Sequence, residues 1–211
     1  HGLDTTPSFI MLKPLTQAHS WAGYHTGLGT GSGNDKVIRW DTTTMGDQSG
    51  DAWQNNPFAT EHVITFGSQT GQNEDTIPHI MYCWARVPGL IGIGSYAGNG
   101  NDNGANIIVD DGAFGFKPAF VYTKRIDHNS GDWWITDSVR EPYNDRSKAI
   151  YIDNQAEEDA GDNRIDFTAN GFKLRDDSAR RNVDGIYMYL AFAEEPFQGV
   201  TGVDIAQSRA R

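Results

Sequence analysis

The segment TPSFIMLK (Thr6–Lys13) recurs as KPAFVYTK (Lys117–Lys124), and this repetition decides the fold. The two copies lie 111 residues apart, so that Phe9 corresponds to Phe120. Both contain the aromatic and β-branched residues that favour strands. Because self-similarity over such a distance marks repeated structural units, the chain is predicted to contain two homologous modules in tandem.

The match continues beyond this first strand. After a slip of one residue, Trp21 corresponds to Trp133. Two further pairs of segments correspond: DKVIRWD with SKAIYID (Asp35–Asp41 and Ser147–Asp153), and IMYCWA with IYMYLAFA (Ile80–Ala85 and Ile186–Ala193). We therefore predict a first β-sandwich repeat over residues 1–88, lacking its first strand, and a second repeat with a C-terminal tail over residues 89–211.

Glycine and aromatic residues are abundant and indicate an all-β fold. The chain has 24 Gly, 10 Phe, 8 Tyr and 6 Trp among 211 residues, which is typical of short strands joined by tight turns. In TANGFKL, Asn170 and Gly171 separate two strand-like runs and predict a hairpin. The predicted fold is a tandem pair of homologous antiparallel β-sandwich modules of the jelly-roll or lectin-like type. One larger pseudo-symmetric sandwich is the alternative.

Charge and cysteine content exclude several classes of protein. The net charge of -11 repels polyanions at long range, so nucleic acid is not an expected partner. Cys83 is the only cysteine, which rules out an intramolecular disulfide. The longest apolar run, Ile186–Ala193, is too short to cross a bilayer, so we predict no membrane insertion.

Five segments between Val87 and Phe197 together resemble a known family. They are VPGLIGIGSYAGNG, GFKPAFVYTKRID, GDWWITDSVREPYN, IDFTANGFKLR and IYMYLAFAEEPF. They are similar to a duplicated domain of unknown function from bacteriophage tail and other virion proteins, often assigned to the concanavalin A-like lectin group. The resemblance implies a β-sandwich on a phage particle and no established chemistry. Since no GSYAGNG strand precedes the first copy, the sequence is expected to begin inside a unit.

The sequence lacks common catalytic motifs, and we predict no catalytic residues and no enzyme activity. No G-x-S-x-G, H-E-x-x-H or Walker motif occurs. Glu157, Asp159 and Asp162 approximate the E-x-D-x-x-E pattern of lectin-fold glucanases, but turn formers surround them, so we interpret the segment as a solvated acidic loop. Asp137 and Arg140 are predicted to form a structural ion pair that fixes the following loop.

We predict no cofactor and no metal site. The six histidines are scattered without the spacing of metal ligands. Calcium is the remaining alternative, because Asn99, Asn101, Asn103, Gly104 and Asp110 loosely follow the spacing of a calcium loop. A plain turn is the preferred interpretation, since the first position is Asn and the IIV in the segment resembles a strand.

The aromatic residues divide into structural anchors and one ligand candidate. Trp21 and Trp133, together with Phe9 and Phe120, recur at equivalent repeat positions, which is typical of structural anchors. Trp53 lies in a polar stretch and has no counterpart in the other repeat. It is therefore the predicted ligand-binding residue, exposed for a glycan or a neighbouring subunit.

These observations predict a non-catalytic structural protein of the bacteriophage virion, a tail or fibre component with an adhesive role, located on the phage particle. The expected partners are other virion proteins, further copies of the chain in a homo-oligomer, with a trimer favoured, and a host surface glycan. Two alternatives remain open. One is a host-glycan-binding lectin for receptor recognition, and the other is a polysaccharide depolymerase.

Overall fold

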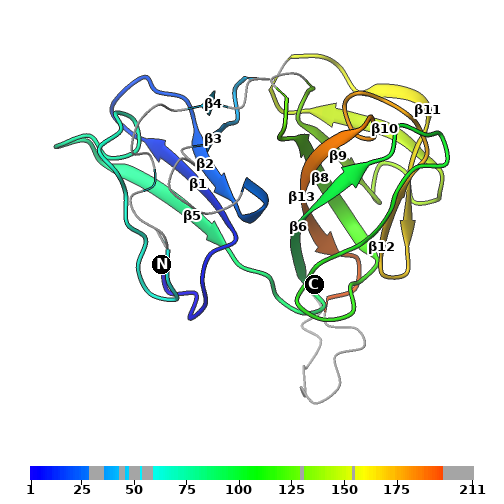
Figure 1. Cartoon of the computed structure of the whole chain (residues 1–211), viewed down its shortest axis with the longest axis horizontal. Helices are drawn as coiled ribbons and strands as arrows, with labels where there is room; N and C mark the ends of the chain where they lie inside the picture. Colours follow the sequence, from blue (N-terminus) through cyan, green and yellow to red (C-terminus); the bar gives the residue numbers. More distant parts are fainter. Residues whose placement is uncertain are drawn as a thin grey trace.

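A computed structural model describes residues 1–28, 36–42, 46–47, 53, 59–128, 131–153 and 155–196. Apart from one 3-10 turn, η1 (Thr26–Leu28), every regular element in this part of the chain is a β-strand. The strands form two antiparallel sheets that face each other across an apolar cluster (Figure 1). The predicted all-β, sandwich-like fold is confirmed. None of the described elements is a helix with the length and apolar character of a membrane span.

The first sheet has the strand order β4-β3-β2-β1-β5. Its strands are β1 (Phe9–Pro14), β2 (Ala22–His25), β3 (Lys36–Arg39), β4 (Gly46–Asp47) and β5 (His79–Trp84). Successive side chains alternate between its faces. Phe9 and Met11 point toward the second sheet, whereas Ile10 points away and packs against Trp53 and the 59–66 segment.

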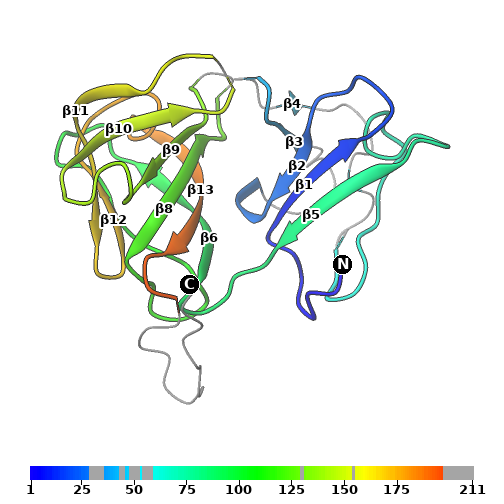
Figure 2. The same cartoon turned by 180° about the vertical axis from the view of Figure 1, so that it is seen from behind.

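The second sheet has the order β6-β13-β8-β9-β10-β11-β12-β7 and encloses a core of its own. Its strands are β6 (Ile91–Gly98), β7 (Asn106–Ile108), β8 (Pro118–Arg125), β9 (Trp134–Asp137), β10 (Arg146–Tyr151), β11 (Asp159–Thr168), β12 (Gly171–Leu174) and β13 (Gly185–Ala193). The Ile93 amide donates to the Asp110 carbonyl over 3.0 Å, which joins the segment after β7 to β6. The sheet thus curls around its buried aromatic residues, and Figure 2 shows the single connection that leads into it from β5.

The two sheets share strand order and register. Strands β5-β1-β2-β3 follow each other in the first sheet as β13-β8-β9-β10 do in the second, with every pair antiparallel. Phe9 pairs with His25, and Phe120 pairs with Asp137. These are the offsets of 111 and 112 residues that relate the two copies in the sequence. Positions of β5 recur in β13 at an offset of 108 residues.

One side-chain contact also recurs between the two sheets. Lys13 Nζ donates to the carbonyl of His19, and Lys124 Nζ donates to the carbonyl of Gly131. Each lysine lies near the end of one strand, and each carbonyl belongs to the connection that leads into the next strand. The same contact therefore holds the same connection in both sheets.

The predicted hairpin joins β11 to β12, but its glycine has a different role from the one expected. The turn residues are Ala169 and Asn170, one position earlier than expected. Gly171 belongs to β12, where a Cβ would come within 1.9 Å of the Ile107 carbonyl oxygen, and its φ is outside the left-handed region. Glycine is required there by the close approach of β7 rather than by the turn.

Candidate binding cleft between the two sheets

An aromatic cleft of about 500 Å³ lies between the two sheets. Its wall is mainly aromatic and includes Phe9, Trp21, Trp84, Phe120, Tyr122 and Phe192. Among the described lining residues, one is charged, Asp41. A concave site with apolar walls and a few polar groups is suited to binding rather than to carrying a reactive group.

The cleft forms because equivalent faces of the two sheets are turned toward each other. Strands β1 and β8 present Phe9 and Phe120, which are equivalent in the repeat. Strands β5 and β13 present Trp84 and Phe192, which pair with those two phenylalanines in their own sheets. The sequence repeat thus supplies both walls.

Three stacked rings make the interior of the site rigid. Trp40 stacks on Trp133 with ring centroids 5.0 Å apart and on Tyr122 at 5.4 Å. Tyr122 and Trp133 are nearly parallel, at 5.5 Å and 8°. Trp133 Nε1 donates to the Thr42 carbonyl over 2.8 Å, so the indole is held by a polar contact as well as by packing.

A second row of rings lies at the accessible side of the first sheet. Trp21 stacks on Tyr82 at 6.5 Å, and Tyr82 stacks on Trp84 at 6.2 Å. Tyr82 is 45% exposed and Ile80, on the same face of β5, is 37% exposed. Across the cleft, the side chain of Ile152 is also exposed. This row offers a flat apolar surface to a partner.

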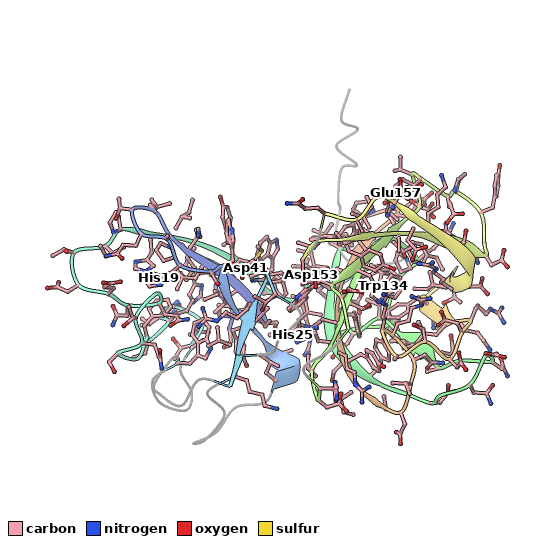
Figure 3. All side chains as sticks on the ribbon, turned by 90° about the horizontal axis from the view of Figure 1, so that it is seen from above. His19, His25, Asp41, Trp134, Asp153 and Glu157 are labelled. Atoms are coloured by element: carbon pink, nitrogen blue, oxygen red, sulfur yellow. The ribbon has the colours of Figure 1, made fainter. Side chains whose placement is uncertain are left out.

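His25 connects the two sheets beside the cleft (Figure 3). Its Nε2 lies 3.0 Å from the Tyr189 carbonyl oxygen of β13, and its Nδ1 accepts from the Gly27 amide over 2.8 Å. Since Nδ1 accepts, the proton is assigned to Nε2, which donates to Tyr189. Complete burial lowers the pKa of His25 to about 4, so the imidazole is neutral at physiological pH.

A buried lysine lies on the second-sheet side of the interior. Lys124 Nζ lies 5.2 Å from the centre of the Trp133 ring. Burial lowers the pKa of Lys124 to about 8, while the carboxylates of Asp153 and Asp132 act in the opposite direction. Asp153, the repeat equivalent of Asp41, accepts from the Trp133 amide over 3.1 Å, and burial raises the pKa of its carboxyl. These groups hold Trp133 in place.

The four predicted anchors separate into two kinds. Phe9 and Trp133 are buried, whereas Trp21 and Phe120 are half-buried and line the cleft. Sequence reasoning missed the contribution of β5. The alternation in HIMYCW, which places Tyr82 on the same face as Ile80 and Trp84, was the available signal.

The prediction that Trp53 lies on the surface is wrong. Trp53 is only 7% exposed and packs against Tyr24 at 5.9 Å and Phe66 at 5.8 Å between ring centroids. Because Phe66 and Ile64 lie over the outer face of the first sheet, the indole becomes part of a core. A surface available to a ligand is found instead at Trp21 and Tyr82.

The acidic segment does not form a pair of carboxylates facing a groove within the described residues. The side chain of Asp162 lies outside those residues, and Glu157 is exposed. Asp159 accepts from the Tyr151 hydroxyl over 2.7 Å and pairs with Arg164 at 2.8 Å. Both contacts lower the pKa of Asp159 and keep it ionised, which is unsuitable for a general acid.

The asparagine-rich loop uses its amide oxygens within the protein. Asn99 and Asn101 accept from the amides two residues later, at 3.1 Å and 2.8 Å. Lys173 Nζ donates to Asn103 Oδ1 over 2.7 Å, which places a positive charge beside the loop. No group of three or more His, Cys, Asp or Glu side chains suited to a metal ion occurs among the described residues.

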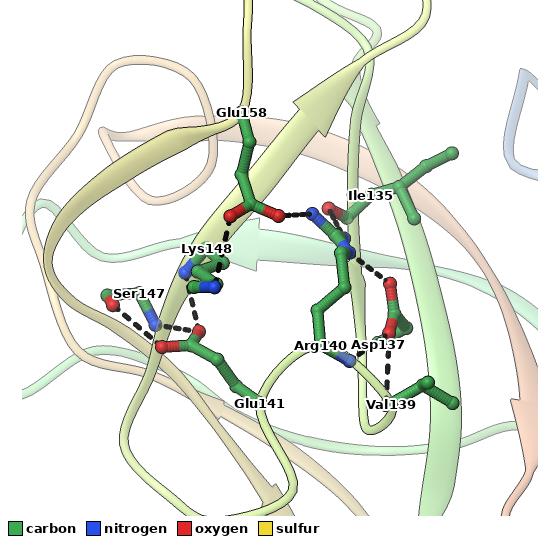
Figure 4. Close-up of polar contacts among 8 residues, drawn as sticks. All are labelled: Ile135, Asp137, Val139, Arg140, Glu141, Ser147, Lys148 and Glu158. Atoms are coloured by element: carbon green, nitrogen blue, oxygen red, sulfur yellow. Dashed lines mark hydrogen bonds and ion pairs between the residues drawn. The ribbon is translucent and has the colours of Figure 1, made fainter.

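The predicted ion pair between Asp137 and Arg140 is confirmed (Figure 4). Arg140 Nε lies 2.5 Å from Asp137 Oδ2, and the guanidinium also reaches Glu158 at 3.2 Å. Glu158 in turn pairs with Lys148 at 3.1 Å. This network joins the loop after β9 to β10 and to the residue before β11, so its role is structural.

The fold and the cleft define an all-β protein of two facing antiparallel sheets with an aromatic binding site between them. Residues 1–196 match the family described as Domain of unknown function (DUF7483), and the chain belongs to this family. No curated protein and no solved structure matches it.

Proposed function

We propose that this chain is a non-catalytic structural protein of a bacteriophage virion, a tail or fibre component with an adhesive role, and that it holds a partner in the aromatic cleft. The resemblance of its five quoted segments to phage virion proteins supports the location. The observation that carries the binding role is the cleft itself, with aromatic walls from both sheets and one charged lining residue among those described.

The chemistry of the cleft favours an apolar or aromatic group of another virion protein. Burying about 150 Å² of apolar surface stabilises a complex by roughly 4 kcal/mol, before the costs of association. Asp41 adds one carboxylate, which would favour a donor or a cation at the edge of the bound group. A homo-oligomer, with the trimer favoured, brings several clefts into one particle and raises the strength of attachment.

The test combines location with binding. Labelled antibodies against this chain should mark the tail or fibre of purified particles, and Trp84→Ala should reduce incorporation or host attachment at least tenfold. Tyr143→Ala, at an exposed aromatic residue that does not line the cleft, should leave both unchanged. Detection of the chain only in the host cytosol, with none in purified particles, would reject the proposal.

A host-glycan-binding lectin is a second candidate because of the stacked row Trp21, Tyr82 and Trp84. Flat exposed rings of this kind can stack on the apolar face of a sugar. A glycan array of host-envelope sugars separates the two functions. Binding that is lost in Tyr82→Ala supports the lectin, and the absence of any binding removes it.

A further inference from the structure

The outer edge of β5 is open within the described residues, although the equivalent edge in the other sheet is covered. Strand β5 pairs with β1 on one side and has no partner on the other. Its counterpart β13 pairs with β8 in the same register and also with β6 along its whole length. The repeat therefore shows what an edge of this kind receives.

The backbone of β5 presents hydrogen-bonding groups at this edge. The Leu15 amide donates to the Pro78 carbonyl, so alternate residues from Pro78 onward bond toward β1. By the same alternation, the amides and carbonyls of Met81 and Cys83 point to the open side. In β13 the Ala193 amide donates to Leu90 beside β6, which sets the matching parity there.

The side chains of β5 lack the features that normally protect an edge. The strand HIMYCW contains no Asp, Glu, Lys, Arg or Pro, although edge strands are usually protected by such residues. Ile80 and Tyr82 are exposed on its cleft face. Their equivalents, Met188 and Leu190, are buried where β6 lies beside β13.

We propose that the open edge of β5 receives an antiparallel β-strand from outside residues 1–211, with the chemistry of β6. That chemistry is an uncharged strand, IGIGSYAG, with isoleucines at alternate positions. Ile91 and Ile93 lie opposite Phe192 and Leu190, which correspond to Trp84 and Tyr82 of β5. The incoming strand would place its aliphatic side chains beside those two rings and lengthen the apolar wall of the cleft.

A second copy of this chain does not supply such a strand from its own β6, because β6 is bonded to β13 over eight residue pairs. The uncharged edge of β5 is matched by the absence of charge in β6. Main-chain bonds then provide affinity, and the alternating aliphatic side chains provide specificity. This inference concerns a surface separate from the partner site proposed for the cleft.

The experiment uses the whole chain and a synthetic peptide with capped ends and the sequence LIGIGSYAG (Leu90–Gly98). We expect saturable binding at peptide concentrations up to about 1 mM, with slowed amide exchange at Met81 and Cys83. Methylation of the peptide nitrogens at Gly92 and Gly94 should abolish binding, because these residues face β13 through hydrogen-bonded pairs. Methylation at Ile93 and Ser95 is the matched control and should retain it.

A protein variant gives an independent readout. Ile80→Lys introduces a charge at the edge and should weaken peptide binding at least tenfold, whereas Ile108→Lys, at a 58% exposed isoleucine of β7, should leave it unchanged. Three outcomes would overturn the inference. They are the absence of binding, binding that survives methylation at Gly92 and Gly94, and exchange protection of β5 that grows with protein concentration alone, which would indicate pairing of two β5 edges.

Discussion

The His25 imidazole donates to the backbone carbonyl of Tyr189 across the boundary between the sheets, at 3.0 Å. It is a fully buried titratable side chain at the end of β2, and its partner lies in the middle of β13. The contact requires the neutral ring, because Nδ1 must accept from the Gly27 amide. Protonation would remove this acceptor.

Stability should therefore fall as the pH drops from about 6.5 to about 4. The unfolded chain binds a proton at His25 below its ordinary pKa of 6.5, while the folded chain resists it down to about 4. In this window the unfolded state binds more protons, so the free energy of unfolding rises with pH, by about 3 kcal/mol for this group. Urea unfolding between pH 4 and pH 7 measures the slope. His25→Gln should flatten it, whereas His62→Gln, at an exposed histidine, should not; equal slopes in wild type and His25→Gln would contradict the assignment.

Trp133→Ala should cost about 3–5 kcal/mol of unfolding free energy, as expected for a large buried aromatic side chain. The substitution removes the ring between Trp40 and Tyr122 and the bond to Thr42. Trp21→Ala, at the equivalent but half-buried position, should cost less than about 2 kcal/mol. Urea denaturation followed by circular dichroism compares the two. Equal costs would mean that the stack contributes nothing special.

Trp53→Ala should destabilise the protein without altering binding in the cleft. The indole packs on the outer face of the first sheet, opposite the cleft, so its loss leaves a cavity beside Tyr24 and costs about 3 kcal/mol or more. A thermal melt measures the loss. A variant that kept its wild-type melting temperature and lost partner binding would restore the surface interpretation.

Gly171→Ala should cost about 1–3 kcal/mol because the new methyl group meets the Ile107 carbonyl. Asn170→Ala, in the turn itself, provides the comparison and should cost less. Urea unfolding of both variants decides between the close approach of β7 and the turn as the reason for the glycine. A larger cost at Asn170 would favour the turn.

The double substitution Glu157→Ala and Asp159→Ala should have no effect on any cleavage of polysaccharide by particles that carry this chain. Glu157 is exposed, and Asp159 is engaged by Tyr151 and Arg164. Reducing-sugar release from capsule or cell-wall polysaccharide is the measurement. Loss of an existing activity in the variant would revive the depolymerase alternative.

Much of the strand pairing could be predicted because it is written twice in the sequence. The shift from Phe9–Phe120 to Trp21–Trp133 by one residue matches the register of the strands around β1 and β8. The hydrophobic alternation of each copy is local, and so it can be read without knowledge of the fold.

The cleft could not be predicted in this way because it depends on how the two copies face each other. Nothing in the local pattern of HIMYCW states that Tyr82 and Trp84 will remain accessible beside a second sheet. The failure at Trp53 has a similar cause. Its polar neighbours suggested solvent, but Phe66, more than ten residues away, covers it. Long-range packing decided burial in both cases.

The unequal enclosure of the two sheets has a consequence for how the chain acquires its structure. The second sheet closes around its own aromatic interior, whereas the first relies on the second to shield Phe9 and Trp40. The C-terminal half can therefore serve as the template on which the N-terminal half condenses during synthesis. Produced by itself, the N-terminal half would present a sticky aromatic surface and would tend to aggregate.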